Sequence, residues 1–285
     1  MDFKIRGIFE DYRRGLLDRR EFLRRLAVLM GGTAAASALL PRLEAEGKAA
    51  QLIPENDSRL ETDTIVYPAE SGEMRAYRAR PRGDGRQPGV IVIHENRGLV
   101  PHIKDVARRV ALEGYVAVAP DALSPLGGTP GNPDEARPLF QKLDRRTNMK
   151  NFVAAVAYLK TNPQTTGKVA CMGFCWGGGV TNHVAVNAPH LDAAVPFYGS
   201  QPPAEDVPKI KAAMLIHYAG DDPRINAGIP DFKKALEKAN VEHEIHIYEG
   251  TKHAFFNDTG QRYNKEAAEL AWRRTVLFLR KKLKA

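Results

Sequence analysis

A cysteine flanked by glycines is the residue in this sequence best suited to covalent chemistry. The segment 173–178 reads GFCWGG, which has the form G-x-C-x-G of a nucleophile elbow with sulfur at its centre. A strand that turns abruptly into a helix strains the backbone at Cys175 and brings neighbouring chain close. Gly173 and Gly177 remove side chains that would collide there. The pattern therefore predicts a thiol that attacks a carbonyl carbon.

The helix expected to begin at Trp176 would serve this thiol in two ways. Its N-terminus is expected to lower the pKa of Cys175, and the Trp176 N–H is expected to stabilise a developing oxyanion. The alternative is a buried, inert cysteine, the commonest fate of a free cysteine. Cys171, within the preceding strand, fits that alternative, whereas the strand, turn and helix around Cys175 favour the nucleophile. A disulfide between the two would disable the elbow.

A base and an orienting acid are expected further along the chain, because in this type of site the acid and then the histidine follow the nucleophile. Asp221 and Asp222 follow one predicted strand, and His253 follows the last one. His253 would take the thiol proton or stand as an imidazolium beside a thiolate, while the acid fixes its tautomer. Spacing alone leaves Asp221 and Asp222 as alternatives. A surface role is the alternative for His253, and its place after the last strand disfavours it.

The elements that must position these residues alternate between strands and helices beyond residue 60. We predict strands at 64–66, 74–79, 90–93, 115–119, 168–172, 193–197, 212–217 and 244–248. We predict helices at 102–112, 148–160, 176–186, 229–239 and 264–283, and a Gly- and Pro-rich loop at 124–133. Such alternation builds a mostly parallel sheet with helices on both faces, here an α/β-hydrolase fold. Its carboxyl edge, where ligands bind, would carry the elbow, the acid and the histidine.

The composition is that of a globular chain. Of its 285 residues, 43% are apolar, which can fill a core and excludes an intrinsically disordered protein. The formal charge of +8 is spread over many segments, so we expect a basic enzyme with no nucleic-acid partner. No compact set of His, Asp and Glu has the spacing of metal ligands, so we expect no metal and no cofactor. A positive surface would suit an anionic small-molecule substrate.

The amino end is expected to be an export leader. Arg19-Arg20 is followed by Glu21, Phe22 and Leu23 and then by a weakly apolar run, an order that resembles the twin-arginine signal of bacteria. An amphipathic helix packed on the domain is the alternative. We therefore predict a leader at 1–47, a linker at 48–62 and one catalytic domain at 63–285. The protein would be periplasmic or otherwise exported by the twin-arginine machinery, and cytoplasmic if the leader does not function.

These residues together resemble the dienelactone hydrolases, or carboxymethylenebutenolidases. The resemblance covers the predicted catalytic domain, and its most specific parts are HENRG at 94–98, the elbow, and HAF at 253–255. The acid turn at 222–226 reads DPRIN, which resembles an exported, twin-arginine branch of that family. The resemblance implies that Asp222, rather than Asp221, is the triad acid. It also implies hydrolysis of an ester or lactone through a Cys175–His253–Asp222 triad and an acyl-thioester.

The resemblance implies two further residues beside the elbow. Glu95 would interact with the resting cysteine and help to form the thiolate when substrate arrives, and a carboxylate at that sheet edge could accept the S–H hydrogen bond. A solvated loop acid is the alternative. The backbone N–H of Asn96 would be the second oxyanion donor, beside that of Trp176.

One departure from the family bears on the substrate. The classical members of the family that the chain resembles carry an arginine four residues after the catalytic histidine, to hold the lactone carboxylate, and this chain has Asn257 at that position. Arginines that could replace that charge are Arg97, Arg137, Arg145 and Arg224. Tyr198, at a strand end, is a candidate pocket residue, with simple packing as the alternative. A broad carboxylesterase on the same fold and a non-catalytic binding protein are the rival functions.

Overall fold

The computed structural model describes residues 53–284 and, near the amino end, residues 19–33 and the single positions 5, 8, 17 and 36. Helix α2 (Arg19–Met30) starts at the arginine pair. Phe22 and Leu26 are fully buried in a small separate apolar cluster. Among the described residues, no helix is long and apolar enough to cross a membrane. Positions 37–52, which include the start of the predicted linker, lie outside the described residues.

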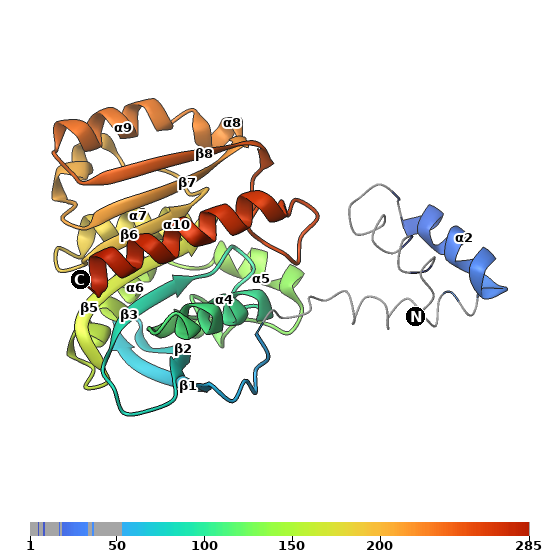
Figure 1. Cartoon of the computed structure of the whole chain (residues 1–285), viewed down its shortest axis with the longest axis horizontal. Helices are drawn as coiled ribbons and strands as arrows, with labels where there is room; N and C mark the ends of the chain where they lie inside the picture. The colour runs from blue at the N-terminus through green and yellow to red at the C-terminus, as the bar shows by residue number, and fades with distance from the viewer. Residues whose placement is uncertain are drawn as a thin grey trace.

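An eight-stranded sheet organises the body, in the order β1-β2-β4-β3-β5-β6-β7-β8 (Figure 1). Strands β1 and β2 form an antiparallel hairpin, β2 is antiparallel to β4, and all the remaining neighbours are parallel. The strands are β1 (Leu60–Ala69), β2 (Gly72–Pro81), β3 (Gln87–Ile93), β4 (Val116–Pro120), β5 (Thr165–Phe174), β6 (Ala193–Phe197), β7 (Ala213–Asp221) and β8 (His243–Lys252). The predicted α/β-hydrolase architecture is confirmed.

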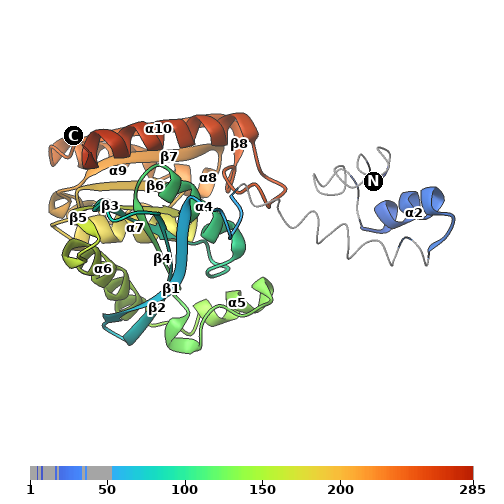
Figure 2. The ribbon, with the colours of Figure 1, turned by 60° about the horizontal axis from the view of Figure 1, so that its bottom comes forward.

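Helices cover both faces of this sheet. They are α4 (Pro101–Leu112), α5 (Pro133–Phe140), α6 (Arg145–Thr161), α7 (Trp176–Asn187), α8 (Pro223–Asn226), α9 (Ile229–Lys238) and α10 (Lys265–Leu283), with short 3-10 turns at Ser124–Leu126 and Ala204–Lys209. Figure 2 shows α10 on one side of the sheet and α6 on the other. Val90 and Val92 pack with α4 and α10, whereas Ile91 and Ile93 pack with α6 and α7. This alternation follows from the two-residue period of a strand.

Two features of the body differ from the sequence-based expectation. The body begins before residue 63, because β1 starts at Leu60 and the backbone of Ile53 bonds to α4 through Asp105 and Arg108. Helix α5 was not predicted, since Pro138 lies inside it and interrupts the apolar pattern. Residues 53–62, expected to be linker, are therefore part of the folded body.

Candidate active site

The elbow has the strained backbone that its glycines predict. Cys175 joins β5 to α7 with φ 57° and ψ −115°, a backbone conformation that L-amino acids rarely adopt. A Cβ atom on Gly173 would lie 2.3 Å from the carbonyl oxygen of Gly177. One on Gly177 would lie 2.4 Å from the carbonyl oxygen of His94, so the end of β3 packs directly on the first turn of α7. Both glycines are therefore required by close backbone approach.

The pKa of the Cys175 thiol departs from the sequence-based expectation. Burial and the nearby charge of Glu95 raise this pKa to about 11, although the Trp176 N–H and the charges of Arg224 and Arg262 act to lower it. The predicted net lowering by the helix N-terminus is therefore wrong, because desolvation and a neighbouring carboxylate outweigh one N–H group. The resting group at neutral pH is a protonated thiol rather than a thiolate.

The histidine and acid come together at the carboxyl edge of the sheet. Asp222 follows β7 and is buried, whereas its neighbour Asp221 is exposed. Nδ1 of His253, just after β8, lies 2.5 Å from Oδ2 of Asp222. Asn226 holds the acid turn by donating from Nδ2 to the carbonyl oxygens of Ala219 (2.8 Å) and Gly220 (3.1 Å). The pairing that spacing left open is thus settled geometrically as His253 with Asp222.

Tyr198 contacts the ring of His253 and lines the cavity beside Cys175. It follows β6 with φ 37°, its ring centroid is 5.1 Å from that of His253, and it lines the same cavity as Cys175. Its buried hydroxyl has no hydrogen-bond partner within the described part of the chain. Burial, Glu95 and Cys175 raise the pKa of this phenol well above its usual value. A neutral hydroxyl is therefore available to a bound molecule.

Glu95 is held by the residue that departs from the family pattern. Oε2 of Glu95 accepts a hydrogen bond of 2.7 Å from Nδ2 of Asn257, and Glu95 is 9% exposed. The sequence did not indicate this contact, because the two residues are 162 positions apart. The carboxylate that raises the pKa of Cys175 is thus oriented by an uncharged amide.

A charged network fixes the loop that carries Asn257. The next residue, Asp258, receives a hydrogen bond of 2.9 Å from Nδ1 of His102 and an ion pair of 2.5 Å from Arg109, both on α4. Arg109 also pairs with Asp105. Burial acts to raise the pKa of Asp258, but His102 and Arg109 outweigh it and lower that pKa to about 2. The loop after β8 is therefore attached to α4 by charge.

A cavity of about 450 Å³ opens beside the sulfur. Five of the residues predicted to form the site line this cavity, namely Asn96, Cys175, Trp176, Tyr198 and Arg224. Arg145, one of the arginines considered as a replacement for the family's carboxylate-binding arginine, lines it as well. The lining that sequence reasoning missed comprises Phe140, Leu143, Asn148, Met149, Gly179, Val180, His183, Ser200 and Ile225. A period-based pattern cannot indicate these residues, because they come from separate segments that meet only in the fold.

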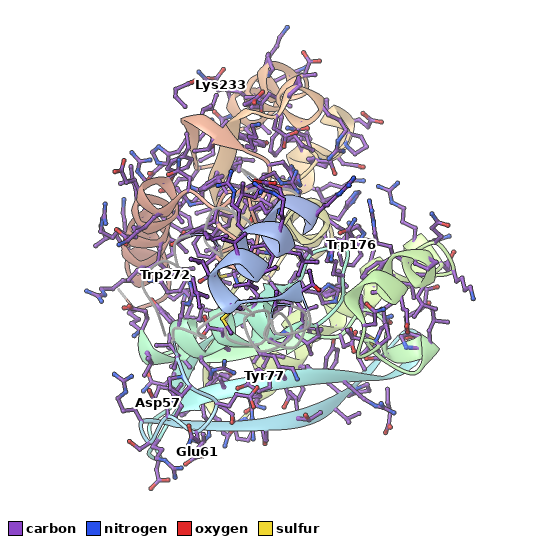
Figure 3. The ribbon with its side chains drawn as sticks, turned by 90° about the vertical axis from the view of Figure 1, so that its right-hand side faces the viewer. Asp57, Glu61, Tyr77, Trp176, Lys233 and Trp272 are labelled. Atoms are coloured by element: carbon purple, nitrogen blue, oxygen red, sulfur yellow. The ribbon has the colours of Figure 1, made fainter. Side chains whose placement is uncertain are left out.

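The cavity wall combines aromatic and cationic groups. Trp176, labelled in Figure 3, meets the ring of Phe140 from α5 with a centroid distance of 4.9 Å. The Arg145 guanidinium lies 3.5 Å from Nε2 of His183. The buried side chain of Asn148 has an Oδ1 atom without a partner in the described ranges. Arg97 is exposed and is not part of the wall formed by the described residues, so the expectation that it binds substrate is not supported by its position.

No cluster of three or more His, Cys, Asp or Glu residues suited to a metal ion occurs in the part of the chain that the structure describes. A strained cysteine at a strand-to-helix turn, a buried acid–histidine pair and a parallel sheet that presents both at one edge define an α/β-hydrolase.

Comparison with known proteins gives the family. Residues 74–283 match the model of the dienelactone hydrolase family. A protein named "Putative carboxymethylenebutenolidase" from Saccharolobus solfataricus is 36% identical, over 76% of this chain and 97% of its own length. A Bradyrhizobium protein named "Probable 2-oxo-3-(5-oxofuran-2-ylidene)propanoate lactonase" is 33% identical, over 74% and 90%. The chain belongs to the dienelactone hydrolase family and is a hydrolase that acts on ester or lactone bonds.

A solved structure agrees with this assignment. The crystal structure of a "Putative Dienelactone Hydrolase" from Klebsiella pneumoniae superposes with a TM-score of 0.69 at 29% identity. The superposition covers 76% of this chain and 97% of that one. The crystal structure of a Pyrococcus horikoshii acylaminoacyl peptidase, at 16% identity and a TM-score of 0.61, shares the fold alone.

Proposed function

We propose that the protein hydrolyses a carboxylic ester or lactone through Cys175, His253 and Asp222, by way of an acyl-thioester. One observation carries this proposal. The Asp222–His253 hydrogen bond lies at the sheet edge where the elbow presents Cys175, and Tyr198 contacts His253 while lining the cavity with the cysteine. These positions support the roles of nucleophile for Cys175, base for His253 and orienting acid for Asp222.

The raised pKa of Cys175 sets the order of proton transfers. At rest the sulfur keeps its proton, and Glu95 accepts the S–H hydrogen bond and helps to withdraw that proton once substrate is bound. As sulfur attacks the carbonyl carbon, the proton passes to His253, and Asp222 stabilises the imidazolium. His253 then protonates the departing alkoxide, which leaves the acyl-thioester. A water molecule gives its proton to His253 and attacks the thioester, after which the proton returns to sulfur.

Two backbone N–H groups would stabilise the negative oxygen of each tetrahedral intermediate. Trp176 N–H lies at the start of α7 and already interacts with the sulfur, which lowers the thiol pKa. Asn96 lines the same cavity, and its N–H has no acceptor among the residues that the structure describes. Each such donor contributes on the order of 10²-fold or more to the rate.

The substrate is proposed to be an ester or lactone that carries a negative charge. Arg145 and Arg224 line the cavity, which supports recognition of an anionic group at a distance from the scissile bond. Asn257 bonds to Glu95 and occupies the position where the family resemblance implies a carboxylate-binding arginine. We therefore place the charge recognition on Arg145 and Arg224 instead. The broad carboxylesterase is the second candidate, and uncharged acetate esters test it.

The triad is tested by turnover of p-nitrophenyl acetate and of anionic lactones. Cys175→Ala and His253→Ala are expected to abolish turnover, and Cys171→Ala is the matched control because its sulfur is buried inside β5. Intact-protein mass spectrometry of the wild type quenched in acid during turnover is expected to show one acetyl adduct, and Cys175→Ala is expected to show none. Full turnover in Cys175→Ala would reject the mechanism, and no turnover of any ester by the wild type would favour a binding protein.

We further propose that the amino end directs export by the twin-arginine machinery. The support is the order of Arg19-Arg20, Phe22-Leu23 and a weakly apolar run in the sequence. Arg19→Lys together with Arg20→Lys is expected to retain the protein in the cytoplasm, and Arg24→Lys with Arg25→Lys is the matched control. Fractionation that finds the first double variant exported as well as the wild type would reject the leader.

A further inference from the structure

His94 is a fully buried histidine that no step of the proposed reaction uses. It follows β3 and directly precedes Glu95 and Asn96. Its Nδ1 atom lies 2.6 Å from the carbonyl oxygen of Glu95, and its Nε2 atom lies 3.1 Å from the backbone nitrogen of Ala122, in the loop after β4. Both ring nitrogens are therefore engaged by backbone groups.

These two contacts allow a single protonation state. The Ala122 N–H is only a donor, so Nε2 must accept and carries no proton. The Glu95 carbonyl is only an acceptor, so Nδ1 must carry the proton and donate. Burial lowers the pKa of His94, although the charge of Asp121 acts to raise it, which agrees with a neutral ring. The environment of His94 thus selects the neutral Nδ1–H tautomer.

The bond from His94 to the Glu95 carbonyl (2.6 Å) is the shorter of the two that this oxygen accepts, the other coming from the Gly98 N–H (3.4 Å), and it helps to fix where the next N–H points. The Glu95–Asn96 peptide is trans, so its carbonyl oxygen and its N–H lie in one plane and point in opposite directions across the C–N bond. With the carbonyl turned toward His94, the Asn96 N–H is turned away from it. A rotation of this peptide by half a turn would replace the N–H by a carbonyl oxygen, which repels a developing oxyanion.

The same ring contacts the element that supplies the other oxyanion donor. His94 stacks on Trp176 with a centroid distance of 5.5 Å and an interplanar angle of 16°, and Phe140 meets its edge at 5.7 Å. Its carbonyl oxygen would lie 2.4 Å from a Cβ atom on Gly177. His94 therefore bonds to the Glu95 carbonyl and also stacks on the side chain of Trp176, the residue whose N–H is the other proposed oxyanion donor.

We propose that His94 is a positioning residue that holds the Glu95–Asn96 peptide with its N–H directed to the oxyanion, and that it acts only as the Nδ1–H tautomer. This rests on the proposed function, because Asn96 N–H matters only if Cys175 attacks a carbonyl. The role predicts a selective defect. Attack on an ester creates an oxyanion, whereas alkylation of the same sulfur by iodoacetamide displaces iodide and creates none.

The test compares acylation with alkylation of Cys175. His94→Phe keeps a ring against Trp176 but removes both hydrogen bonds. We expect the ratio of the p-nitrophenyl acetate burst rate to the iodoacetamide rate to fall about 100-fold, with KM changed less than about threefold. His94→Gln has an amide that can donate to the Glu95 carbonyl. We expect its acylation-to-alkylation ratio to be at least about tenfold higher than that of His94→Phe.

His217→Phe is the matched control. His217 is equally buried and lies within β7. Its ring nitrogens contact Tyr248 Oη (2.9 Å) and Thr275 Oγ1 (3.1 Å), and its ring packs at a tilt against Phe197, with a centroid distance of 4.4 Å. It is expected to lose stability while its acylation-to-alkylation ratio stays at the wild-type value. An unchanged ratio in His94→Phe, or an equal fall in His217→Phe, overturns the role of His94. Turnover that survives in Cys175→Ala overturns the triad instead, so the two failures are distinguishable.

A measurement on the unaltered protein covers the case in which His94→Phe does not fold. With ¹⁵N-labelled histidine, the two nitrogen shifts of each neutral ring report its tautomer. The histidine signal that the wild type shows and His94→Gln lacks belongs to His94. We expect its nitrogen shifts to be those of the Nδ1–H tautomer from pH 6 to pH 8. An Nε2–H tautomer or an imidazolium at this site would overturn the proposal.

Discussion

The loops that follow β3 and β8 approach the same cysteine, but they are held by different forces. The loop after β3 is held by a neutral imidazole, since His94 bonds to the backbone of Glu95 and Ala122. The loop after β8 is held by side-chain contacts to carboxylates, from His253 to Asp222 and from His102 and Arg109 to Asp258. The two loops meet where Asn257 bonds to Glu95.

The difference teaches which side of the site should respond to pH. A buried neutral ring that is hydrogen-bonded to backbone groups keeps its protonation state across the physiological pH range. We therefore expect the orientation of the oxyanion donors not to depend on pH. The side that carries the base contains groups whose protonation changes their interaction energy. Proton transfer to and from His253 therefore falls on the loop after β8, whereas the loop after β3 supplies the fixed backbone dipoles and the Glu95 carboxylate that acts on the S–H group. The following predictions test this division.

Asp222→Asn should give the largest effect. The amide cannot orient the Nδ1–H of His253 or stabilise its cation, so we expect kcat to fall about 10³- to 10⁴-fold, with KM nearly unchanged. Steady-state kinetics with p-nitrophenyl acetate measure this loss. Asp221→Asn is the matched control, because Asp221 is exposed. A similar loss in Asp221→Asn would show that the wrong acid has been paired with His253.

Glu95→Gln should separate thiol acidity from turnover. The charge of Glu95 raises the pKa of Cys175, so its removal is expected to move the midpoint of iodoacetamide alkylation from about 11 to lower pH. If Glu95 helps to withdraw the proton, kcat nevertheless falls, by about tenfold. The pH profile of alkylation measures the first effect and ester turnover the second. An unmoved alkylation midpoint would contradict the influence of Glu95 on the sulfur.

Asp258→Asn should weaken the attachment of the loop after β8 to α4. The variant removes the carboxylate that His102 and Arg109 share, although Arg109 keeps its pair with Asp105, so we expect the free energy of unfolding at pH 7 to fall by about 2 kcal/mol. Because the pKa of Asp258 is lowered to about 2, this stabilisation is present above about pH 4 and is lost as pH falls toward 2. Urea unfolding at pH 7 and at pH 3 should show a smaller difference between variant and wild type at the lower pH.

Asp206→Asn is the control for that experiment. Its ion pair with Lys209 is exposed, at 62% for the lysine and 30% for the aspartate, so its removal is expected to cost less than about 0.5 kcal/mol. An equal loss in both variants would show that the Asp258 network contributes no more than an exposed surface pair.

Cys171→Ala should give the smallest effect. Burial raises the pKa of Cys171 to about 12, and its sulfur contacts Thr181 inside the core. We expect a loss of stability of about 1 kcal/mol and no change in kcat or in the extent of alkylation. Mass spectrometry after iodoacetamide treatment should show one adduct in wild type and variant alike. Two adducts on the folded wild type would mean that the interior position of Cys171 is not inert.

Local sequence patterns predicted much of this molecule. The elbow glycines, the chain order of Cys175, Asp222 and His253, and the alternation of strands and helices are each visible within short segments, because turn sterics and strand or helix period act locally. The strands at β3, β5 and β6 were therefore predicted within a few residues. Helix α5 was missed, since Pro138 breaks its local pattern and packing against Trp176 and His94 compensates.

The tertiary structure alone decided how these groups act on one another. The pairing of His253 with Asp222 rather than Asp221, the hold of Asn257 on Glu95, and the net rise in the pKa of Cys175 all depend on contacts between distant segments. Desolvation and hydrogen-bond direction are properties of the folded environment, and no residue carries them by itself. The sequence by itself determined which groups stand at the carboxyl edge of the sheet, and only folding decided their charges and orientations.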